Sequence, residues 1–177
     1  FKASQTTPVT FSQELSEAAL LYADLSDATT NDPGLDAVLT DIGTLGGSFS
    51  LARALNNSGA VVGFSSLPSE SVFRAFVTSG GQMFDAGSLG GTFSAAMAIS
   101  DTGHIVGDSN VPEDGSVFRA FLVTPSGSGV DLGTLGGSWS TAVAVNSSGA
   151  VAGYSVLAGD TAMHAYLYNG QTMVDLG

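Results

Sequence analysis

The chain has 177 residues, of which 44% are hydrophobic, so it is long and apolar enough for one domain with a packed core. Its 16 acidic and 4 basic residues give a formal net charge of −12, which repels phosphate backbones and anionic lipids and argues against nucleic-acid and membrane-surface partners. It has no cysteine, which excludes disulfides, thiolate metal sites and cysteine nucleophiles, and no apolar run long enough for membrane insertion.

Residues 1–40 form an N-terminal extension whose central part, residues 10–25, has two interpretations. A helix is favoured by apolar residues at helical spacing. Strands are favoured instead by a match between residues 19–22 (Ala-Leu-Leu-Tyr) and 165–168 (Ala-Tyr-Leu-Tyr). On the second interpretation the extension contains the last two strands of a structural unit. The helical stripe comprises Phe11, Leu15, Ala18, Tyr22 and Leu25.

A ten-residue glycine-rich motif, Asp-x-Gly-Thr/Ser-Leu-Gly-Gly-Ser/Thr-Phe/Trp-Ser, occurs three times, and a fourth copy starts at Asp175. The copies begin 44, 46 and 44 residues apart, a period that indicates a repeat architecture. We therefore divide the rest of the chain into three repeat units within one domain. The units are 41–84, 85–130 and 131–177, and their motifs span 41–50, 85–94 and 131–140.

Each unit carries short apolar segments in the same order, and each segment predicts a β-strand. The first segment has alanines on one face, as at Ala96 and Ala98, which implies that some other part of the structure packs very close to it. The turn that follows is rich in Asn, Asp and Ser and ends in Gly, which predicts a hairpin whose glycine has a positive φ. A return strand, a variable loop and two further strands complete the unit.

Four short strands in a unit of this length match a blade of a β-propeller better than any helical repeat. We therefore predict an all-β, repeat-built, propeller-like fold with three four-stranded blades and a partial N-terminal blade in residues 1–40. Propellers usually have at least four blades, so this arrangement leaves strand edges exposed. Three outcomes stay open: an irregular four-bladed ring, a fragment of a longer array, or a blade completed by strands from a neighbouring copy.

Three signatures recur in every unit: the start of the glycine motif, a return strand similar to Gly-x-Val-Val-Gly, and a tripeptide similar to His-Ala-Phe. Together they resemble the HAF repeat family, extracellular repeats of bacteria, over residues 41–177. The tripeptide departs from the family pattern, with Arg for His in two units and Tyr for Phe in the third. The resemblance implies an extracellular, repeat-built module and carries over no catalytic residue. The tripeptides are Arg74-Ala75-Phe76, Arg119-Ala120-Phe121 and His164-Ala165-Tyr166.

The Asp that opens each motif and the basic residue that opens each tripeptide are recurrent charged positions. We expect the Asp to cap its turn by accepting backbone N–H bonds, with a cation ligand as the alternative. We expect the basic residues to form a structural network with these Asp, joined by Ser50, Ser94 or Ser140. If such a pair is buried, Arg119→Ala is expected to cost about 3–5 kcal/mol. The predicted network comprises Asp41, Asp85, Asp131, Asp175, Arg74, Arg119 and His164.

No constellation of residues predicts catalysis, a metal site or a cofactor. The glycine motif lacks the Lys and the strand-to-helix context of a phosphate loop, and no Gly-x-Ser-x-Gly elbow has a plausible base. The acidic pairs Glu14/Glu17 and Glu113/Asp114 lie in the extension and in a variable loop, where solvated surface explains them. His104 has no partner for metal binding and is expected to be exposed.

The aromatic residue of the motif is Phe49, Phe93 or Trp139. We expect these rings to wedge between adjacent sheets as part of the core, and the alternative is an exposed aromatic ledge for sugars.

The repeats and the lack of a catalytic set predict a non-enzymatic, extracellular or cell-surface structural module. The strands missing from a partial blade allow copies to join by strand completion into a homo-oligomer or a filament. The alternative is a propeller that binds a glycan, a peptide or a cation through its variable loops. Concentration-dependent polymers favour the first function, and a monomer with a tightly bound soluble ligand favours the second.

Overall fold

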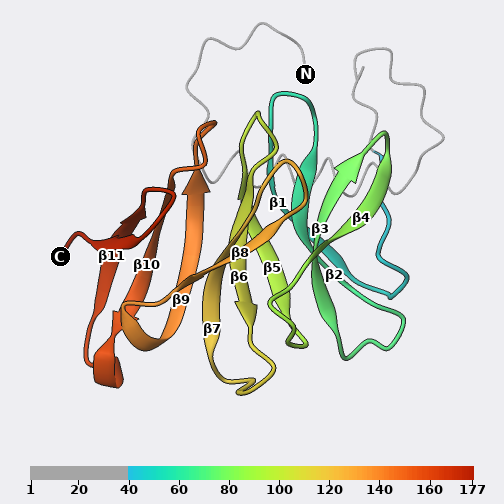
Figure 1. Ribbon diagram of the computed structural model, residues 1–177. Helices are drawn as coiled ribbons and strands as arrows, with labels where there is room; N and C mark the ends of the chain where they lie inside the picture. The colour runs from blue at the N-terminus through green and yellow to red at the C-terminus, as the bar shows by residue number, and fades with distance from the viewer. Residues whose placement is uncertain (1–39) are drawn as a thin grey trace, which may run out of the picture. The chain divides into compact units, whose positions relative to one another are not determined.

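Residues 40–177, which the computed structural model describes, are all-β (Figure 1), as predicted. The chain from Ile42 to Gly177 forms one unit with its own core. The alternatives for residues 10–25 lie outside the described residues, as does the predicted partial blade except for Thr40. The elements are β1 (Ser50–Leu55), β2 (Val61–Ser66), β3 (Phe73–Ser79), β4 (Gln82–Gly87), β5 (Ser94–Ile99), β6 (Ile105–Asn110), β7 (Phe118–Val123), β8 (Gly129–Gly133), β9 (Gly136–Val145), β10 (Val151–Leu157), a 3-10 turn η1 (Ala158–Asp160), β11 (Met163–Tyr168) and β12 (Met173–Asp175).

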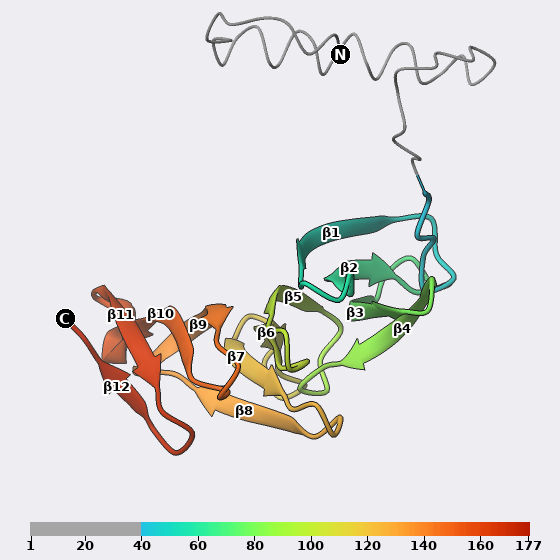
Figure 2. The ribbon, with the colours of Figure 1, turned by 90° about the horizontal axis from the view of Figure 1, so that it is seen from above.

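The strands form three antiparallel four-strand meanders: β1–β4, β5–β8 and β9–β12. The first is a sheet of its own, and the other two share a sheet in which β7 and β9 meet at one parallel bridge, Phe118 to Trp139. A similar bridge joins Phe73 of the first meander to Phe93, just before β5. The three meanders follow one another in chain order within this unit (Figure 2). The described residues close no ring or barrel.

Polar turns join the first and second strands of each meander in the predicted way. In the first turn the Asn56 carbonyl accepts a 3.0 Å bond from the Gly59 N–H, and the Asn56 Oδ1 accepts bonds from the N–H groups of Ser58 and Ala60. The closing glycine has a positive φ in all three turns, which the predicted hairpin requires. The φ values are 79° at Gly59, 87° at Gly103 and 81° at Gly149.

The first strand of every meander is bulged between its two alanines. In β5 the pairing with β6 passes from Ala96 to Ala98, so one residue is left out of the ladder. A Cβ at the opposing Gly107 would collide with the carbonyl oxygen of Ala95, so this close approach requires glycine. The same bulge and the same crowded glycine recur at Gly63 opposite β1 and at Gly153 opposite β9.

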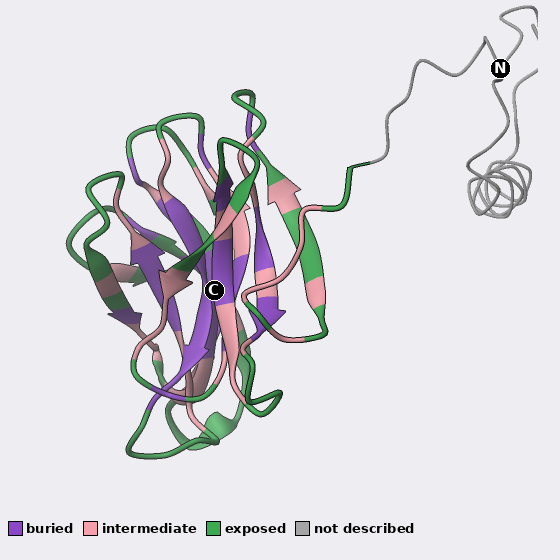
Figure 3. Cartoon of the chain, turned by 90° about the vertical axis from the view of Figure 1, so that its right-hand side faces the viewer, coloured by how far each residue is buried: buried purple, intermediate pink, exposed green. Residues whose placement is uncertain are grey.

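Two apolar clusters lie between consecutive meanders. Most buried residues lie on the strands, while the turns and loops and parts of β1, β4, β11 and β12 are exposed (Figure 3). Ala96 and Ala142 are fully buried against the preceding meander, but Ala98 is half-buried and Ala144 is exposed. The bulge turns the two alanines of each strand to opposite sides of the sheet, so the predicted single alanine face is wrong. Ala52 in β1 is exposed. The first cluster joins Val62 and Ala75 to Ala96, Ile105 and Phe121; the second joins Val106, Ala120, Leu122 and Leu132 to Ala142, Val151, Tyr166 and Tyr168.

Candidate functional site

The Asp that opens the second, third and fourth copies of the motif lies at the end of a meander and closes a tight turn. Its Oδ1 accepts a bond from the N–H of the glycine two residues later, and that glycine adopts a left-handed conformation that other residues avoid. The carboxylates therefore act as turn caps, in the way expected from the sequence. The bonds are Gly87 to Asp85 at 2.7 Å, Gly133 to Asp131 at 2.8 Å and Gly177 to Asp175 at 2.9 Å. Asp41 opens the first copy and is exposed.

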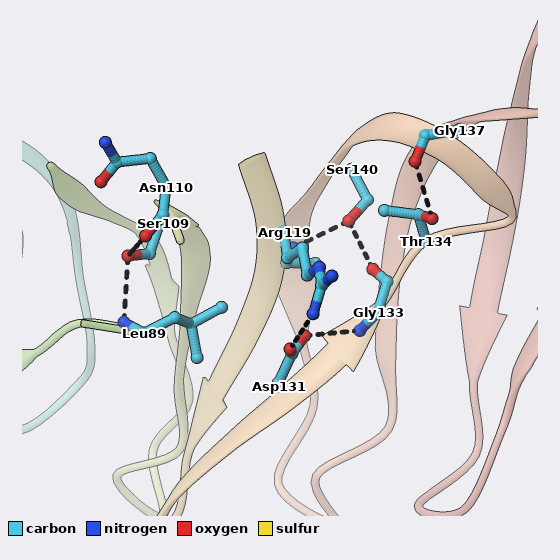
Figure 4. Close-up of polar contacts among 10 residues, drawn as sticks. Leu89, Ser109, Asn110, Arg119, Asp131, Gly133, Thr134, Gly137 and Ser140 are labelled. Carbon is cyan, nitrogen blue, oxygen red and sulfur yellow. Dashed lines mark hydrogen bonds and ion pairs between the residues drawn. The ribbon is translucent and has the colours of Figure 1, made fainter. Parts of the chain in front are cut away.

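The basic residues of the tripeptides meet these carboxylates in two of three cases. Arg119 donates to Asp131 Oδ2 at 3.0 Å (Figure 4), and His164 Nδ1 lies 2.9 Å from Asp175 Oδ1. Arg74 instead donates to the carbonyl oxygen of Gly91, at 3.0 Å, in the next copy of the motif. The structure thus brings together two of the predicted pairs and gives Arg74 a backbone partner.

The Arg119–Asp131 pair is exposed, which corrects the estimate made for a buried pair. The side chains are 43% and 36% exposed, so water screens the interaction and solvates either partner when the other is removed. The expected cost of Arg119→Ala falls to about 1 kcal/mol or less. The Arg119–Asp131 ion pair therefore contributes little to the stability of the contact between β7 and the next motif.

Buried serines make the recurrent bonds between consecutive meanders. The Ser140 hydroxyl donates to the Gly133 carbonyl at 2.6 Å and accepts the Ala120 N–H of β7 at 2.8 Å (Figure 4). Ser94 does the same between Gly87 and Ala75. Ser94 and Ser140 are fully buried, so each hydroxyl satisfies backbone groups that water cannot reach. We call Ser94 and Ser140 the bridging serines; Ser50, in the same place of its motif, donates to Gly43 at 2.7 Å.

A second series of buried serines, in the return strands, was not predicted from the sequence. Ser109 in β6 accepts the Leu89 N–H at 3.0 Å (Figure 4) and donates to the carbonyl oxygen of Phe93. It therefore binds the backbone of the glycine motif on both sides of the Gly90-Gly91 pair. The available signal was a serine two residues after the crowded glycine of every return strand. The equivalent serines are Ser65 and Ser155, which are also fully buried and accept the N–H groups of Leu45 and Leu135.

Acidic residues of two variable loops bind the backbone of the motif. Glu70 accepts the Ser48 N–H at 2.7 Å, and Asp160 accepts the Ser138 N–H at 2.8 Å. The Ser138 N–H is the main reason that the pKa of Asp160 is lowered. Both acids have a positive φ, at 57° and 54°, which non-glycine residues rarely adopt, and the bonds to the motif backbone offset that cost. These carboxylates are thus engaged in holding the loops to the sheets.

One carboxylate is buried among the described residues. Asp108 in β6 is 6% exposed and stands where the other meanders have the aromatic residues Phe64 and Tyr154. Its partner is the Thr141 hydroxyl of β9, which donates at 3.3 Å. Burial raises the pKa of Asp108 to about 6, while the Thr141 bond and the charge of Arg53 act in the opposite direction. Asp108 thus lies at the junction between the second and third meanders.

The aromatic residues of the motif pack as expected in one case and are partly exposed in another. The Phe93 ring lies 5.7 Å from Phe64, 6.2 Å from Phe73 and 5.8 Å from Phe118, so it wedges between the first two meanders. The Trp139 ring packs 5.3 Å from Tyr154 of its own meander. The Phe49 ring, in the first copy, is on a residue that is 42% exposed.

Two hollows in the surface of the described residues lie at the turn end of the meanders. A groove of about 430 Å³ runs between the first two meanders, lined by Asn56, Thr78, Asp101 and Thr124 among others. His104, predicted to be exposed, is half-buried beside this turn end and hydrogen-bonds to Thr102 at 2.9 Å. In residues 40–177 no three His, Asp or Glu side chains converge to hold a metal ion.

Comparisons with protein-family models, with curated proteins and with solved structures each found no match. Within the described part of the chain, no helix has the length and apolar character needed to cross a bilayer. The roles of the recurrent residues are therefore inferred from their contacts in the structure. Its recurrent polar groups cap turns, bridge meanders and fix loops, and its apolar groups fill the space between sheets.

We predict that Ser140→Ala destabilises the chain by about 1–3 kcal/mol, because the buried N–H of Ala120 loses its acceptor. Urea unfolding followed by circular dichroism measures this loss. Ser128→Ala, at an exposed serine, is the matched control and should stay within about 0.5 kcal/mol. Equal stability of the two variants would contradict the role of the bridging serine.

We predict that Asp108→Asn stabilises the chain above pH 6. The pKa of Asp108 is raised from 3.8 to about 6 on folding, so the folded state binds the extra proton and this group's contribution to stability falls as pH rises through that interval. The asparagine variant lacks that loss, which amounts to about 2–3 kcal/mol at pH 8. Urea unfolding between pH 4 and pH 8 measures the difference between the two proteins. A difference that does not change with pH would overturn the prediction.

Proposed function

We propose that this chain is a non-enzymatic, extracellular or cell-surface structural module that works by self-association. Its three meanders act as consecutive propeller-type blades, each stacked on the next. The resemblance of the motifs to HAF repeats supports the location and the repeat-built architecture. The recurrent polar groups support a structural role, because they are used in turn caps, serine bridges and loop anchors.

The observation that carries the proposal is an apolar sheet face that has no covering sheet among the described residues. In β5–β8 this face is packed against the third meander, and Leu122 is only 6% exposed. In β9–β12 the equivalent Leu167 is 41% exposed and Val174 is 42% exposed. A continuous exposed apolar face of this kind marks an association surface.

Strand completion through residues 1–40 is a second route to the same self-association. In that route an incomplete blade takes strands from a neighbouring copy. Either route yields a homo-oligomer or, when the contact is heterologous and does not close, a filament.

We predict that the chain forms oligomers whose size rises with concentration, because burial of the exposed apolar face favours association. Size-exclusion chromatography with light scattering, and negative-stain images of the same sample, measure this. Leu167→Asp should reduce the average mass of the assemblies several-fold without unfolding the chain, since the side chain is exposed in the single copy.

Ser128→Asp is the control, since it adds the same charge at an exposed turn away from this face. A clean monomer at every concentration would refute the proposal. It would favour instead a binding module, with the groove between the first two meanders as the place to search for a ligand.

A further inference from the structure

We propose that the outer face of β9–β12 is covered by the β1–β4 meander of a second copy, packed face to face and head to tail. This inference rests on the proposed function and names the partner and the contact. The contact repeats the packing that already joins the first meander to the second and the second to the third.

The apolar residues of the outer face lie on one side of the sheet. The strand registers place Ala144 opposite Ala152, Ala152 opposite Leu167, and Leu167 opposite Val174. All of them are exposed, whereas their counterparts in β5–β8 are buried or half-buried beneath the third meander. The outer face comprises Ala144, Ala152, Ala165, Leu167, Val174 and Leu176, and the counterparts are Ala98, Val106, Ala120, Leu122, Val130 and Leu132.

The first meander offers the matching half of this contact. In the second meander Ala96 and Ile99 pack on the preceding meander, but the equivalent Ala52 is exposed and the equivalent Leu55 is 69% exposed. The outer face of β9–β12 and the exposed face of β1–β4 thus lie at opposite ends of the series of three meanders. Such a contact is heterologous, so each addition creates the next acceptor face.

The internal junctions define which residues should pair along the edge of the proposed contact between copies. At both internal junctions the first residue of a third strand forms a parallel bridge with the motif aromatic of the next meander: Phe73 with Phe93, and Phe118 with Trp139. The third equivalents are Met163, which is 51% exposed, and Phe49, which is 42% exposed. A thioether against a phenyl ring is a favourable contact, so we pair Met163 with Phe49 of the incoming copy.

A hairpin turn adds a polar contact at the junction of the first two meanders. Asn56 donates through Nδ2 to the carbonyl oxygen of Ser100, one meander further on, at 3.1 Å, and Asn56 is buried by this contact. Asn146 holds the same place in the third meander and is exposed. In the proposed assembly its amide donates to the Asn56 carbonyl oxygen of the incoming copy. A lipid tail has no such acceptor, and the first turn of this chain presents it at the place that the internal junction defines, which favours a second copy as the occupant.

The test is a disulfide between copies, because the chain has no cysteine of its own. Bridged strands place paired Cα atoms about 4.8 Å apart, inside the range that a disulfide spans. The variant with Phe49→Cys and Met163→Cys should therefore form a ladder of covalent oligomers on oxidation, with a 49–163 linkage in peptide mass spectra. Mixing a chain that carries only Phe49→Cys with one that carries only Met163→Cys should give the mixed dimer.

Two controls calibrate the result. Phe73→Cys with Phe93→Cys reproduces an internal bridge and should form its disulfide within one chain. Phe49→Cys with Ser128→Cys places the second thiol off the face and should cross-link at least about tenfold more slowly. Thermal unfolding of the reduced variants checks that each one folds.

The outcomes separate this inference from the proposed function. Polymers in light scattering without a 49–163 linkage would overturn the head-to-tail contact and leave self-association standing, with strand completion as its route. A 49–163 linkage confined to monomers would overturn it in favour of closure within one chain. Monomers without linkage would overturn both.

Discussion

The structure depends on a buried hydroxyl that makes two backbone hydrogen bonds between consecutive meanders. The Ser140 hydroxyl accepts a hydrogen bond from the Ala120 N–H of one meander and donates one to the carbonyl oxygen of Gly133, in the motif that leads to the next. Water does not reach this point, so each group would be unsatisfied without the serine. The bond fixes where the next motif begins relative to the preceding sheet. Repetition of the bond at Ser94 gives the two internal junctions one geometry.

The sequence predicted the elements that depend on local chemistry and period. The four-strand order, the glycine of each hairpin turn and the turn-capping Asp follow from spacing and from backbone preferences, and the structure has them. The hydrogen-bond partners of the long side chains could not be predicted from the sequence, because they depend on which strands lie beside each side chain. Arg74 therefore finds the Gly91 carbonyl, and the Arg119 pair lies in water. The serines at 65, 109 and 155 were overlooked because a serine is common in exposed positions, and only the packing of the motif over β2, β6 and β10 buries them.

One residue departs from the repeat in a way that costs stability. Asp108 stands where its counterparts are aromatic, and its carboxylate is buried between the second and third meanders, with the Thr141 hydroxyl at 3.3 Å and the charge of Arg53 to offset the lost hydration. A buried residue that departs from the repeat pattern indicates a local requirement other than stability. Here that residue is Asp108, at the junction of the second and third meanders. The outer face of β9–β12 is a different case, since it keeps the apolar pattern of the series and has no sheet on it among the described residues.

Amide hydrogen exchange at Ala165 reports whether a second copy covers the outer face of β9–β12. Its counterparts Ala75 and Ala120 donate their N–H groups to the bridging serines of the next meander, and we assign the same role to Ala165 with Ser50 of an incoming copy. Exchange at Ala165 should slow as protein concentration rises and approach that of Ala120. Exchange at Ala165 that stays fast and independent of concentration, in samples that light scattering shows to be assembled, would contradict the account.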